Sequence, residues 1–475
     1  MSISHNCAVV VTNSLHDTYA LLKHLQPRGK DAAGIWAKGH DRIDVVKWLG
    51  RVDAFSIESL ASIFKGRYHT FGGHIRYATK GAKTLEELLK DAHPHIIGGK
   101  YEYNPSHLIV SDCDVAIIVN GQTDSKYFDS LKEKKFNSNS DSEKLLHYYY
   151  ENGEVELLKK IPGAYFLAIA DKNKEEVIVL RDRTGIRPGF LGEKDGKYFV
   201  ASEDIAAIKN GGKPIKDIEP GSVYYFDPDG NYKKNQIMVP QKKLCFFEFN
   251  YILNRDSTAD KINVRTHRTR LGEKIAKEKF EELKDSDFIT YMPESPEIAA
   301  REFSDKIGIP FTKVFFKKQI EDRAFQGATM KIRKTSIEKN LSLLPGIKEK
   351  IRGKKISVLD DSMVRGVNAS HARKLLYKEA HVKEAIYVLY TPPIGIIGED
   401  GKPRGCYFGV DMPAEDEFIA RIGNTNRTEE EITKIIGMSV IYLSKEKMFE
   451  VFREDGLKSC ELCTYCIGGE HPFEK

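Results

Sequence analysis

Long apolar runs are missing from this sequence, and stretches such as residues 115–119 have only the length of a strand. The N-terminus has neither the basic region nor the apolar region of a secretory signal. Low-complexity tracts and internal repeats are lacking as well. We therefore expect a protein without a membrane span that folds throughout its length in the cytoplasm.

The chain also has few cysteines and a small net charge. The chain has 7 cysteines in 475 residues. Because a reducing cytoplasm disfavours structural disulfides, each cysteine is interpreted as catalytic, metal-binding or simply buried. Lys and Arg number 74 against 69 Asp and Glu, which leaves a net charge of only +5. This balance does not call for nucleic acid as a partner, and we expect anionic small molecules as ligands.

The pattern of short elements changes along the chain. Up to about residue 226, β-type runs alternate with turns and with helical segments at 18–25 and 142–150, which is typical of an α+β fold with antiparallel sheets. Turn residues at 220–221 and 228–230 indicate a boundary near residue 240. Beyond it, strands alternate with helices, as in a parallel α/β sheet. The predicted strands are 8–11, 44–48, 115–119, 164–170, 176–180, 198–201, 288–292, 356–359 and 385–390.

Residues 356–370 form the most specific local pattern. An apolar strand ends in two carboxylates, and a loop with a hydroxyl, an arginine and a glycine leads into a helix. Such a loop offers backbone N–H groups to a phosphate, and the carboxylates can hold ribose hydroxyls, directly or through a divalent ion. The alternative is an acidic pair that only caps the helix. The candidate residues are Asp360, Asp361, Ser362, Arg365 and Gly366.

Cys7 lies at the start of an apolar strand and is the candidate nucleophile. Cleavage after Asn6 would give this thiol its own α-amino group as a base, with a reference pKa of about 8. Such a base raises the thiolate fraction. A buried cysteine in an edge strand is the alternative.

Seven segments in order resemble the N-terminal-nucleophile glutamine amidotransferases. Residues 28–35 read Arg-Gly-Lys-Asp-Ala-Ala-Gly-Ile, and residues 73–79 read Gly-His-Ile-Arg-Tyr-Ala-Thr. Residues 360–366 are similar to the phosphoribosyl pyrophosphate fingerprint of type I phosphoribosyltransferases, in the form found in amidophosphoribosyltransferases. From Cys7 to Pro472 the chain resembles that family. The other five of the seven segments that resemble the glutamine amidotransferases are 120–121, 140–143, 162–165, 181–188 and 201–203.

The resemblance implies a fold and a division into domains. Residues 1–6 are expected to be a propeptide, followed by an α+β N-terminal-nucleophile hydrolase sandwich with αββα layers over 7–240. An α/β parallel-sheet phosphoribosyltransferase domain is expected over 241–455, and a cysteine-rich tail over 456–475.

The same resemblance implies roles for single residues. Cys7 would attack glutamine, and the oxyanion would be held by Asn120 and Gly121. Arg76 suits the α-carboxylate of glutamine and Asp141 its α-ammonium group. Alternatives are a surface ion pair at Arg76, a helix cap at Asp141 and a hairpin turn at 120–121. The implied glutamine-binding residues are Arg28, Arg76 and Asp141; the implied ligands of phosphoribosyl pyrophosphate are Asp360, Asp361, Ser362, Arg365 and Gly366, with Mg²⁺ at Asp360 and Asp361.

Residues 460–466 contain two overlapping C-x-x-C steps, which suit iron–sulphur or zinc. The resemblance implies one 4Fe-4S cluster, with zinc as the alternative. Cys460 is then spare, and Cys113 is expected in the core. The implied cluster ligands are Cys245, Cys406, Cys463 and Cys466.

Some segments depart from the family. Residues 291–296 read Tyr-Met-Pro-Glu-Ser-Pro where the family has Val-Pro-Asp-Ser-Gly, and the segments 323–326 and 339–343 lack two loop cations. Val367 and Asn368 replace two threonines. Smaller changes are Ala8 for Gly and Lys30 for Gln.

We therefore predict an enzyme that makes 5-phosphoribosylamine, glutamate and pyrophosphate from phosphoribosyl pyrophosphate, glutamine and water, the first step of purine synthesis. Purine nucleotide inhibitors and a homo-oligomer are implied by the resemblance alone. The departures leave two alternatives open: a nucleotide- or phosphoribosyl-pyrophosphate-sensing regulator without transfer activity, and an amidotransferase for another phosphorylated acceptor.

Overall fold

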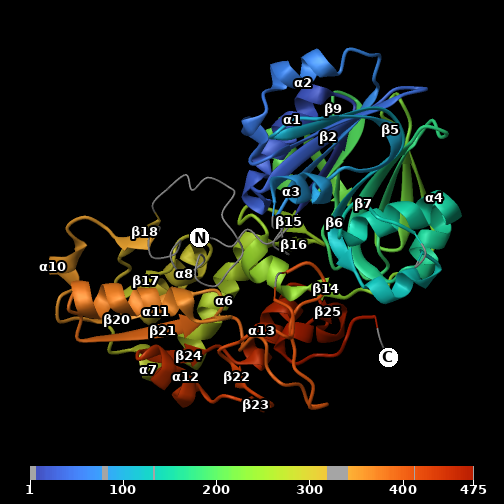
Figure 1. The fold of residues 1–475 in the computed structure, drawn as a ribbon. Helices are drawn as coiled ribbons and strands as arrows, with labels where there is room; N and C mark the ends of the chain where they lie inside the picture. Colours follow the sequence, from blue (N-terminus) through green and yellow to red (C-terminus); the bar gives the residue numbers. More distant parts are fainter. Residues whose placement is uncertain (1–6, 78–83, 132–133, 318–340, 411, 474–475) are drawn as a thin grey trace.

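The computed structural model describes residues 7–77, 84–131, 134–317, 341–410 and 412–473. An antiparallel sheet occupies the N-terminal half and a parallel sheet the C-terminal half, and the two halves lie side by side (Figure 1). The expected propeptide 1–6, Thr79 and the segments 323–326 and 339–340 lie outside the described residues.

The N-terminal half is built on a 13-stranded sheet with the order β11-β9-β10-β1-β4-β2-β3-β6-β7-β8-β12-β13, in which β5 also pairs with β6. Its β-branched and aromatic runs form strands close to the predicted ranges. The strands are β1 (Ala8–Thr12), β2 (Ala32–Lys38), β3 (Ile43–Leu49), β4 (Thr70–Arg76), β5 (His95–Tyr103), β6 (His107–Thr123), β7 (Gly163–Asp171), β8 (Val177–Arg181), β9 (Phe190–Lys194), β10 (Lys197–Ala201), β11 (Lys213–Asp217), β12 (Ser222–Phe226) and β13 (Tyr232–Gln236).

Alternation along the strands produces four layers. Val9 and Val11 of β1 pack in a central core with Phe166 and Ala168 of β7. The residues between them face outward, toward helices on one side of the sandwich and toward α4 on the other. This arrangement confirms the predicted αββα sandwich. The helices are α1 (Leu15–His24), α2 (Ile57–Ile63), α3 (Leu85–Asp91), α4 (Asp141–Lys160) and α5 (Asp204–Lys209), with short turns at η1 (Gln26–Arg28), η2 (Val52–Ala54) and η3 (Ser125–Leu131).

The C-terminal half is built on a four-stranded parallel sheet, ordered β17-β20-β21-β24, as predicted. Both faces are buried, because Val388 of β21 joins one apolar cluster and its neighbour Leu389 joins the other. The strands are β17 (Phe288–Tyr291), β20 (Lys355–Asp360), β21 (Glu384–Leu389) and β24 (Ser439–Tyr442). The helices are α6 (Val264–Glu278), α7 (Phe280–Leu283), α8 (Glu297–Ile307), α10 (Ile347–Ile351), α11 (Val367–Arg373), α12 (Glu429–Ile436) and α13 (Lys445–Glu454), with π-helical turns η4 (Glu248–Ile252) and η5 (Lys374–Glu379).

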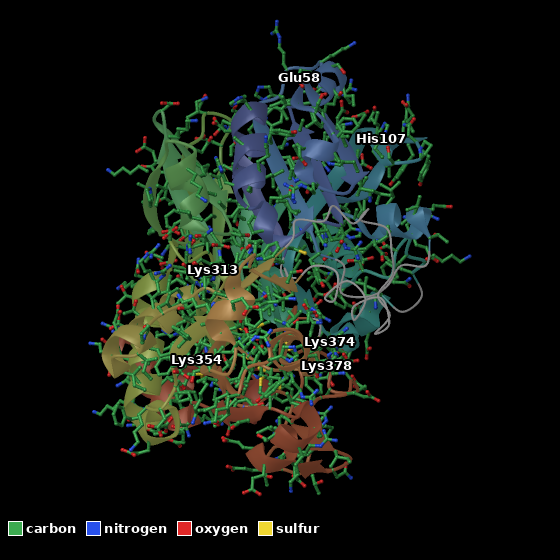
Figure 2. All side chains as sticks on the ribbon, turned by 90° about the vertical axis from the view of Figure 1, so that its left-hand side faces the viewer. Glu58, His107, Lys313, Lys354, Lys374 and Lys378 are labelled. Atoms are coloured by element: carbon green, nitrogen blue, oxygen red, sulfur yellow. The ribbon has the colours of Figure 1, made fainter. Side chains whose placement is uncertain are left out.

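Short two-stranded ladders connect the chain around these sheets. The parallel ladder of β14 and β25 joins the segment after the N-terminal half to the C-terminal tail, and it places Cys245 opposite Cys463. Figure 2 shows the two halves from the side, with Glu58 and His107 on the antiparallel half and four labelled lysines on the parallel half. The small elements are β14 (Leu244–Cys245), β15 (Thr258–Ala259), β16 (Ile262–Asn263), β18 (Phe315–Lys317), β19 (Leu341–Leu343), β22 (Arg421–Ile422), β23 (Thr425–Asn426), β25 (Leu462–Cys463), η6 (Ser459–Glu461) and η7 (Tyr465–Ile467).

In the part of the chain that the structure describes, every helix is too short or too polar to cross a bilayer.

Candidate active site

A cavity of about 510 Å³ lies at one end of the antiparallel sheet. Its wall brings together five of the predicted site residues and leaves Arg28 outside. Most of the wall comes from the ends of β4, β6 and β7 and from the start of α4. The five residues are Cys7, Arg76, Asn120, Gly121 and Asp141.

Cys7 precedes β1, and its thiol lies in a largely desolvated position. Burial raises the pKa of the Cys7 thiol, whereas the Tyr77 backbone N–H and the nearby arginines Arg76, Arg187 and Arg28 lower it. The net shift is upward, so the neutral thiol is the resting form at pH 7. A nucleophile of this kind needs a base at hand.

Asn120 and Gly121 lie inside β6 and pair with β7, so the hairpin-turn alternative is excluded. Among the described residues, the buried Asn120 Nδ2 has no hydrogen-bond partner. A Cβ at Gly121 would lie 1.9 Å from the Ala164 carbonyl oxygen, so only glycine fits. Within the described chain, the Asn120 side chain therefore leaves one buried donor unused in the cavity that the thiol also lines, where buried donors are normally paired.

Arg76 and Asp141 form a charged part of the cavity wall. Arg76 Nη2 lies 3.5 Å from Asp91 Oδ2, and Nη1 is buried without a hydrogen-bond partner in the described chain. Ser140, not Asp141, caps α4. Asp141 Oδ2 instead accepts a hydrogen bond of 2.6 Å from the Thr123 backbone N–H. A cation and an anion thus line the same cavity.

Arg28 is only 3% exposed and lies behind the nucleophile. Its Nε donates to the Cys7 carbonyl oxygen at 3.0 Å, and its Nη1 lies 2.5 Å from Glu203 Oε1. Glu248, which follows the β14 strand, lies 3.5 Å from Arg28 Nη2 and 2.9 Å from Arg187 Nη1. The structure therefore places Arg28 in a buried ion network between the two halves.

The far wall of the cavity is aromatic and comes from the C-terminal half. The ring of Phe408 lies 5.4 Å from Phe473, 5.3 Å from His471 and 6.0 Å from Tyr465, measured between centroids. Residues 407–409 and 465–473 reach the cavity from two separate segments. The sequence analysis missed this wall, although aromatic residues directly beside Cys406 and Cys466 were a signal.

Four cysteines line a second, small cavity next to this wall. Burial raises the pKa of Cys245 and Cys406, and the neighbouring thiols contribute to the increase at Cys245. Within the described ranges, no three of the four sulphurs lie within 4.8 Å of one another. The lining cysteines are Cys245, Cys406, Cys463 and Cys466, whereas Cys460 is exposed and Cys113 is buried in the N-terminal core.

The segment 360–366 follows β20 as predicted. Asp360 and Asp361 are 5% and 7% exposed, and burial raises the pKa of Asp360 to about 6. Burial and the neighbouring carboxylate of Asp360 raise the pKa of Asp361 well above its ordinary value. Tyr387 donates to Asp360 at 2.5 Å, and Ser362 donates to Asp361 at 2.6 Å.

The remainder of the segment turns sharply into α11. Gly366 has a φ of +73°, a conformation that favours glycine, and stands at the N-cap of the helix. Arg365 forms an ion pair with Asp416. Gly366 is the N-cap, so neither aspartate caps the helix directly.

The structure combines a thiol near the start of the chain, at the end of an αββα sandwich, with a parallel sheet that carries the acidic loop 360–366. These features define a glutamine amidotransferase coupled to a phosphoribosyltransferase fold. Comparison with known proteins supports this class. A glutamine amidotransferase domain model matches residues 107–239. The amidophosphoribosyltransferase of Methanocaldococcus jannaschii is 30% identical and covers 95% of this chain and 93% of its own length. That of Bacillus subtilis is 29% identical over 96% of this chain and 91% of its own length.

Solved structures give the same result. The glutamine phosphoribosylpyrophosphate amidotransferase of B. subtilis, complexed with ADP and GMP, has a TM-score of 0.80 and 26% identity over 98% of this chain and 97% of its own. A structure described as the allosteric regulatory enzyme of purine biosynthesis has a TM-score of 0.79 and 26% identity, over 98% of this chain and 96% of its own. The chain belongs to the amidophosphoribosyltransferase family, which confirms the family and the enzyme class predicted from the motifs.

Proposed function

We propose that the chain catalyses the reaction of its family, with Cys7 as the glutaminase nucleophile and residues 360–366 as the phosphoribosyl pyrophosphate site. Residues 7–240 would carry the first reaction, residues 241–455 the second, and residues 456–475 the metal-binding tail. The single observation that carries the glutaminase assignment is the cavity that a thiol, the Asn120 donor, a cation and an anion line together.

The first step forms a thioester. Cleavage after Asn6 frees the α-amine of Cys7, which accepts the thiol proton while the sulphur attacks the amide carbon of glutamine. Asn120 Nδ2 and the Gly121 N–H donate to the oxyanion, the α-ammonium group of Cys7 returns its proton to the leaving nitrogen, and ammonia departs as the thioester forms. Water then hydrolyses the thioester to glutamate and restores the thiol.

Substrate orientation is assigned to Arg76 and Asp141. Arg76 pairs with the α-carboxylate of glutamine through the Nη1 donor that has no partner among the described residues. Asp141 accepts the α-ammonium group. Arg28 acts as a positioning residue, because it donates to the Cys7 carbonyl oxygen from behind the cavity.

The second step takes place at the parallel sheet. Ammonia displaces pyrophosphate from the anomeric carbon, and the products are 5-phosphoribosylamine and pyrophosphate. Asp360 and Asp361 accept ribose hydroxyls, and the backbone of residues 362–366 binds the 5′-phosphate. The raised pKa of Asp360 fits a place for hydroxyl donors or a cation, because either relieves two buried neighbouring carboxylates.

Two metal cofactors belong to the proposal. Mg²⁺ at Asp360 and Asp361 would neutralise pyrophosphate charge when bound. The four cysteines that line one small cavity supply the number of thiolates that a 4Fe-4S cluster takes, with zinc as the alternative metal.

Regulation by nucleotides is proposed from one relative. The B. subtilis structure contains ADP and GMP, which supports purine nucleotides as inhibitors of this chain. A cytoplasmic homo-oligomer completes the assignment.

The test compares Cys7→Ala with the parent protein. With glutamine, the variant should produce glutamate and pyrophosphate only at background rates. With ammonium chloride in place of glutamine, it should still release pyrophosphate from phosphoribosyl pyrophosphate at the parental rate, since the second site is untouched.

Three results would contradict parts of this scheme. Glutaminase activity at the parental level in Cys7→Ala would show that Cys7 is not the nucleophile. Mass spectrometry of active protein that finds residues 1–6 still attached removes the amine base. Absence of pyrophosphate release with ammonia and Mg²⁺ in the parent protein favours the alternative of a sensing regulator.

A further inference from the structure

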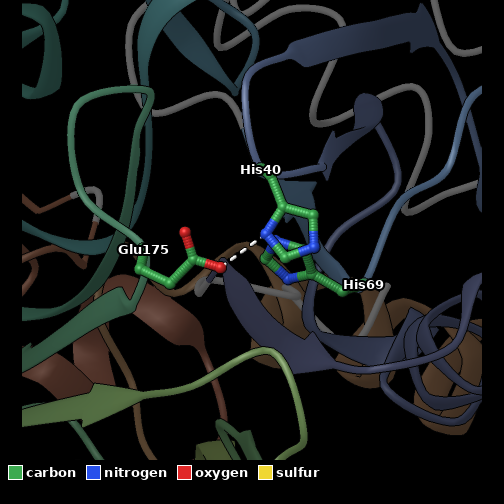
Figure 3. Close-up of side chains that lie close together, drawn as sticks. All are labelled: His40, His69 and Glu175. Carbon is green, nitrogen blue, oxygen red and sulfur yellow. Dashed lines mark hydrogen bonds and ion pairs between the residues drawn. The ribbon is translucent and has the colours of Figure 1, made fainter.

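Three side chains from separate turns meet at the end of the sandwich opposite Cys7 (Figure 3). His40 lies in the turn between β2 and β3, His69 directly precedes β4, and Glu175 lies in the turn between β7 and β8. One potential ligand atom from each residue lies within 4.8 Å of the other two. His40 Nδ1 is 2.5 Å from Glu175 Oε1, and the two imidazole rings lie 5.0 Å apart.

His69 supplies the observation that points to a ligand. Its Nδ1 lies 2.9 Å from Thr70 Oγ1, whereas its Nε2 is buried and has no hydrogen-bond partner in the described structure. When Nδ1 donates its proton to Thr70, Nε2 carries a lone pair directed at the cluster. Buried nitrogens of this kind are normally paired, so the orphan atom indicates a missing partner.

We propose that His40, His69 and Glu175 form a Zn²⁺ site. Two imidazoles and one carboxylate are a common three-ligand set for zinc, with water in the fourth position, and imidazole ligands disfavour Mg²⁺ and Ca²⁺. The side chains of His40 and Glu175 are 69% and 50% exposed, which gives the ion a direct route from solvent. In the absence of zinc, the His40–Glu175 hydrogen bond occupies this place.

The position of the cluster defines its effect. β2 and β4 belong to one layer of the sandwich and β7 to the other, so the ion would join the two layers. β1 and β2 run between this end and Cys7, and six strand steps of β2 span roughly 20 Å. A zinc ion here stabilises the sandwich and is too remote to contact glutamine.

The test is calorimetric titration of the purified full-length protein with ZnCl₂. The parent should bind one zinc that His40→Ala and Glu175→Gln bind about a hundredfold more weakly or not at all. His16→Ala, which removes an exposed histidine on α1, is the matched control and should keep the site. Zinc should also raise the melting temperature of the parent and of His16→Ala, but not of His40→Ala.

Cobalt identifies the ligands by a second route. Co²⁺ bound at this site should give visible d–d bands without the intense thiolate charge-transfer absorption that cysteine ligands produce, and His40→Ala should lose those bands. Equal zinc affinity in the parent and in His40→Ala would overturn the proposal, as would a cobalt spectrum dominated by thiolate charge transfer. Glutaminase turnover should be the same in all of these variants.

Discussion

Buried polar side chains around the glutamine cavity are held in defined charge states. Burial lowers the pKa of His74 to about 3, and it lowers the pKa of His93, which lines the cavity, well below the usual value. These imidazoles therefore stay neutral across the physiological pH range. Charge in the cavity wall comes from residues such as Arg76 and Asp141.

Asn120→Ala should lower kcat for glutamine hydrolysis by a factor on the order of 10² to 10³, because one oxyanion donor is removed. The KM for glutamine should change little, since the donor acts on charge that develops only in the transition state. Steady-state glutamate release measures both constants. The matched control is Asn152→Ala, which alters an exposed asparagine on α4 and should leave both constants unchanged. A parental kcat in Asn120→Ala would contradict the oxyanion assignment.

At the scale of elements, the sequence was sufficient to predict a strand or helix where hydrophobic periodicity and turn residues agree. The apolar strand that contains residues 164–170 and the acidic end of β20 both form as predicted. What could not be predicted is which distant segments meet. Phe408 and Phe473 converge on the glutamine cavity, and His40, His69 and Glu175 converge at the other end, only because long-range strand pairing brings their turns together. Arg28 shows the limit of motif transfer, since its buried ion pairs are invisible in the sequence.

Gly366→Ala should weaken the entry to α11. Its φ of +73° costs an alanine about 1 to 2 kcal/mol, and the new Cβ would approach Ile419 Cδ1 to 2.6 Å and Ile436 Cδ1 to 2.8 Å. The KM for phosphoribosyl pyrophosphate should rise, and the melting temperature should fall.

The matched control is Gly346→Ala. Gly346 also has a left-handed φ, +75°, and N-caps a helix, but a Cβ there meets no atom within 4 Å. Gly346→Ala should therefore suffer only the backbone strain. It should lose less stability than Gly366→Ala and keep the parental KM for phosphoribosyl pyrophosphate. Equal effects of the two substitutions would mean that packing against Ile419 and Ile436 does not matter for the site.

At the scale of the whole molecule, the segments that carry the four lining cysteines also supply one wall of the glutamine cavity. Cys406 precedes the aromatic residues that wall the cavity, and Cys463 and Cys466 flank Tyr465. The β14–β25 ladder holds the tail against the start of the C-terminal half. The proposed metal cluster would tie together ligands that are far apart in sequence, so its loss would release the tail and with it the aromatic wall.

Cys463→Ser should therefore disturb glutamine binding as well as the metal. The purified variant should lose iron and its visible absorption, melt at a lower temperature, and show a KM for glutamine raised about tenfold or more, because the wall formed by Phe408, His471 and Phe473 loses its anchor. Cys460→Ser removes an exposed thiol outside the small cavity and should retain iron, stability and KM. If Cys463→Ser lost its iron yet kept the parental KM for glutamine, the tail would close the cavity without help from the metal, since the apolar contacts of Ile467 and Leu462 with the C-terminal core would then suffice to hold it.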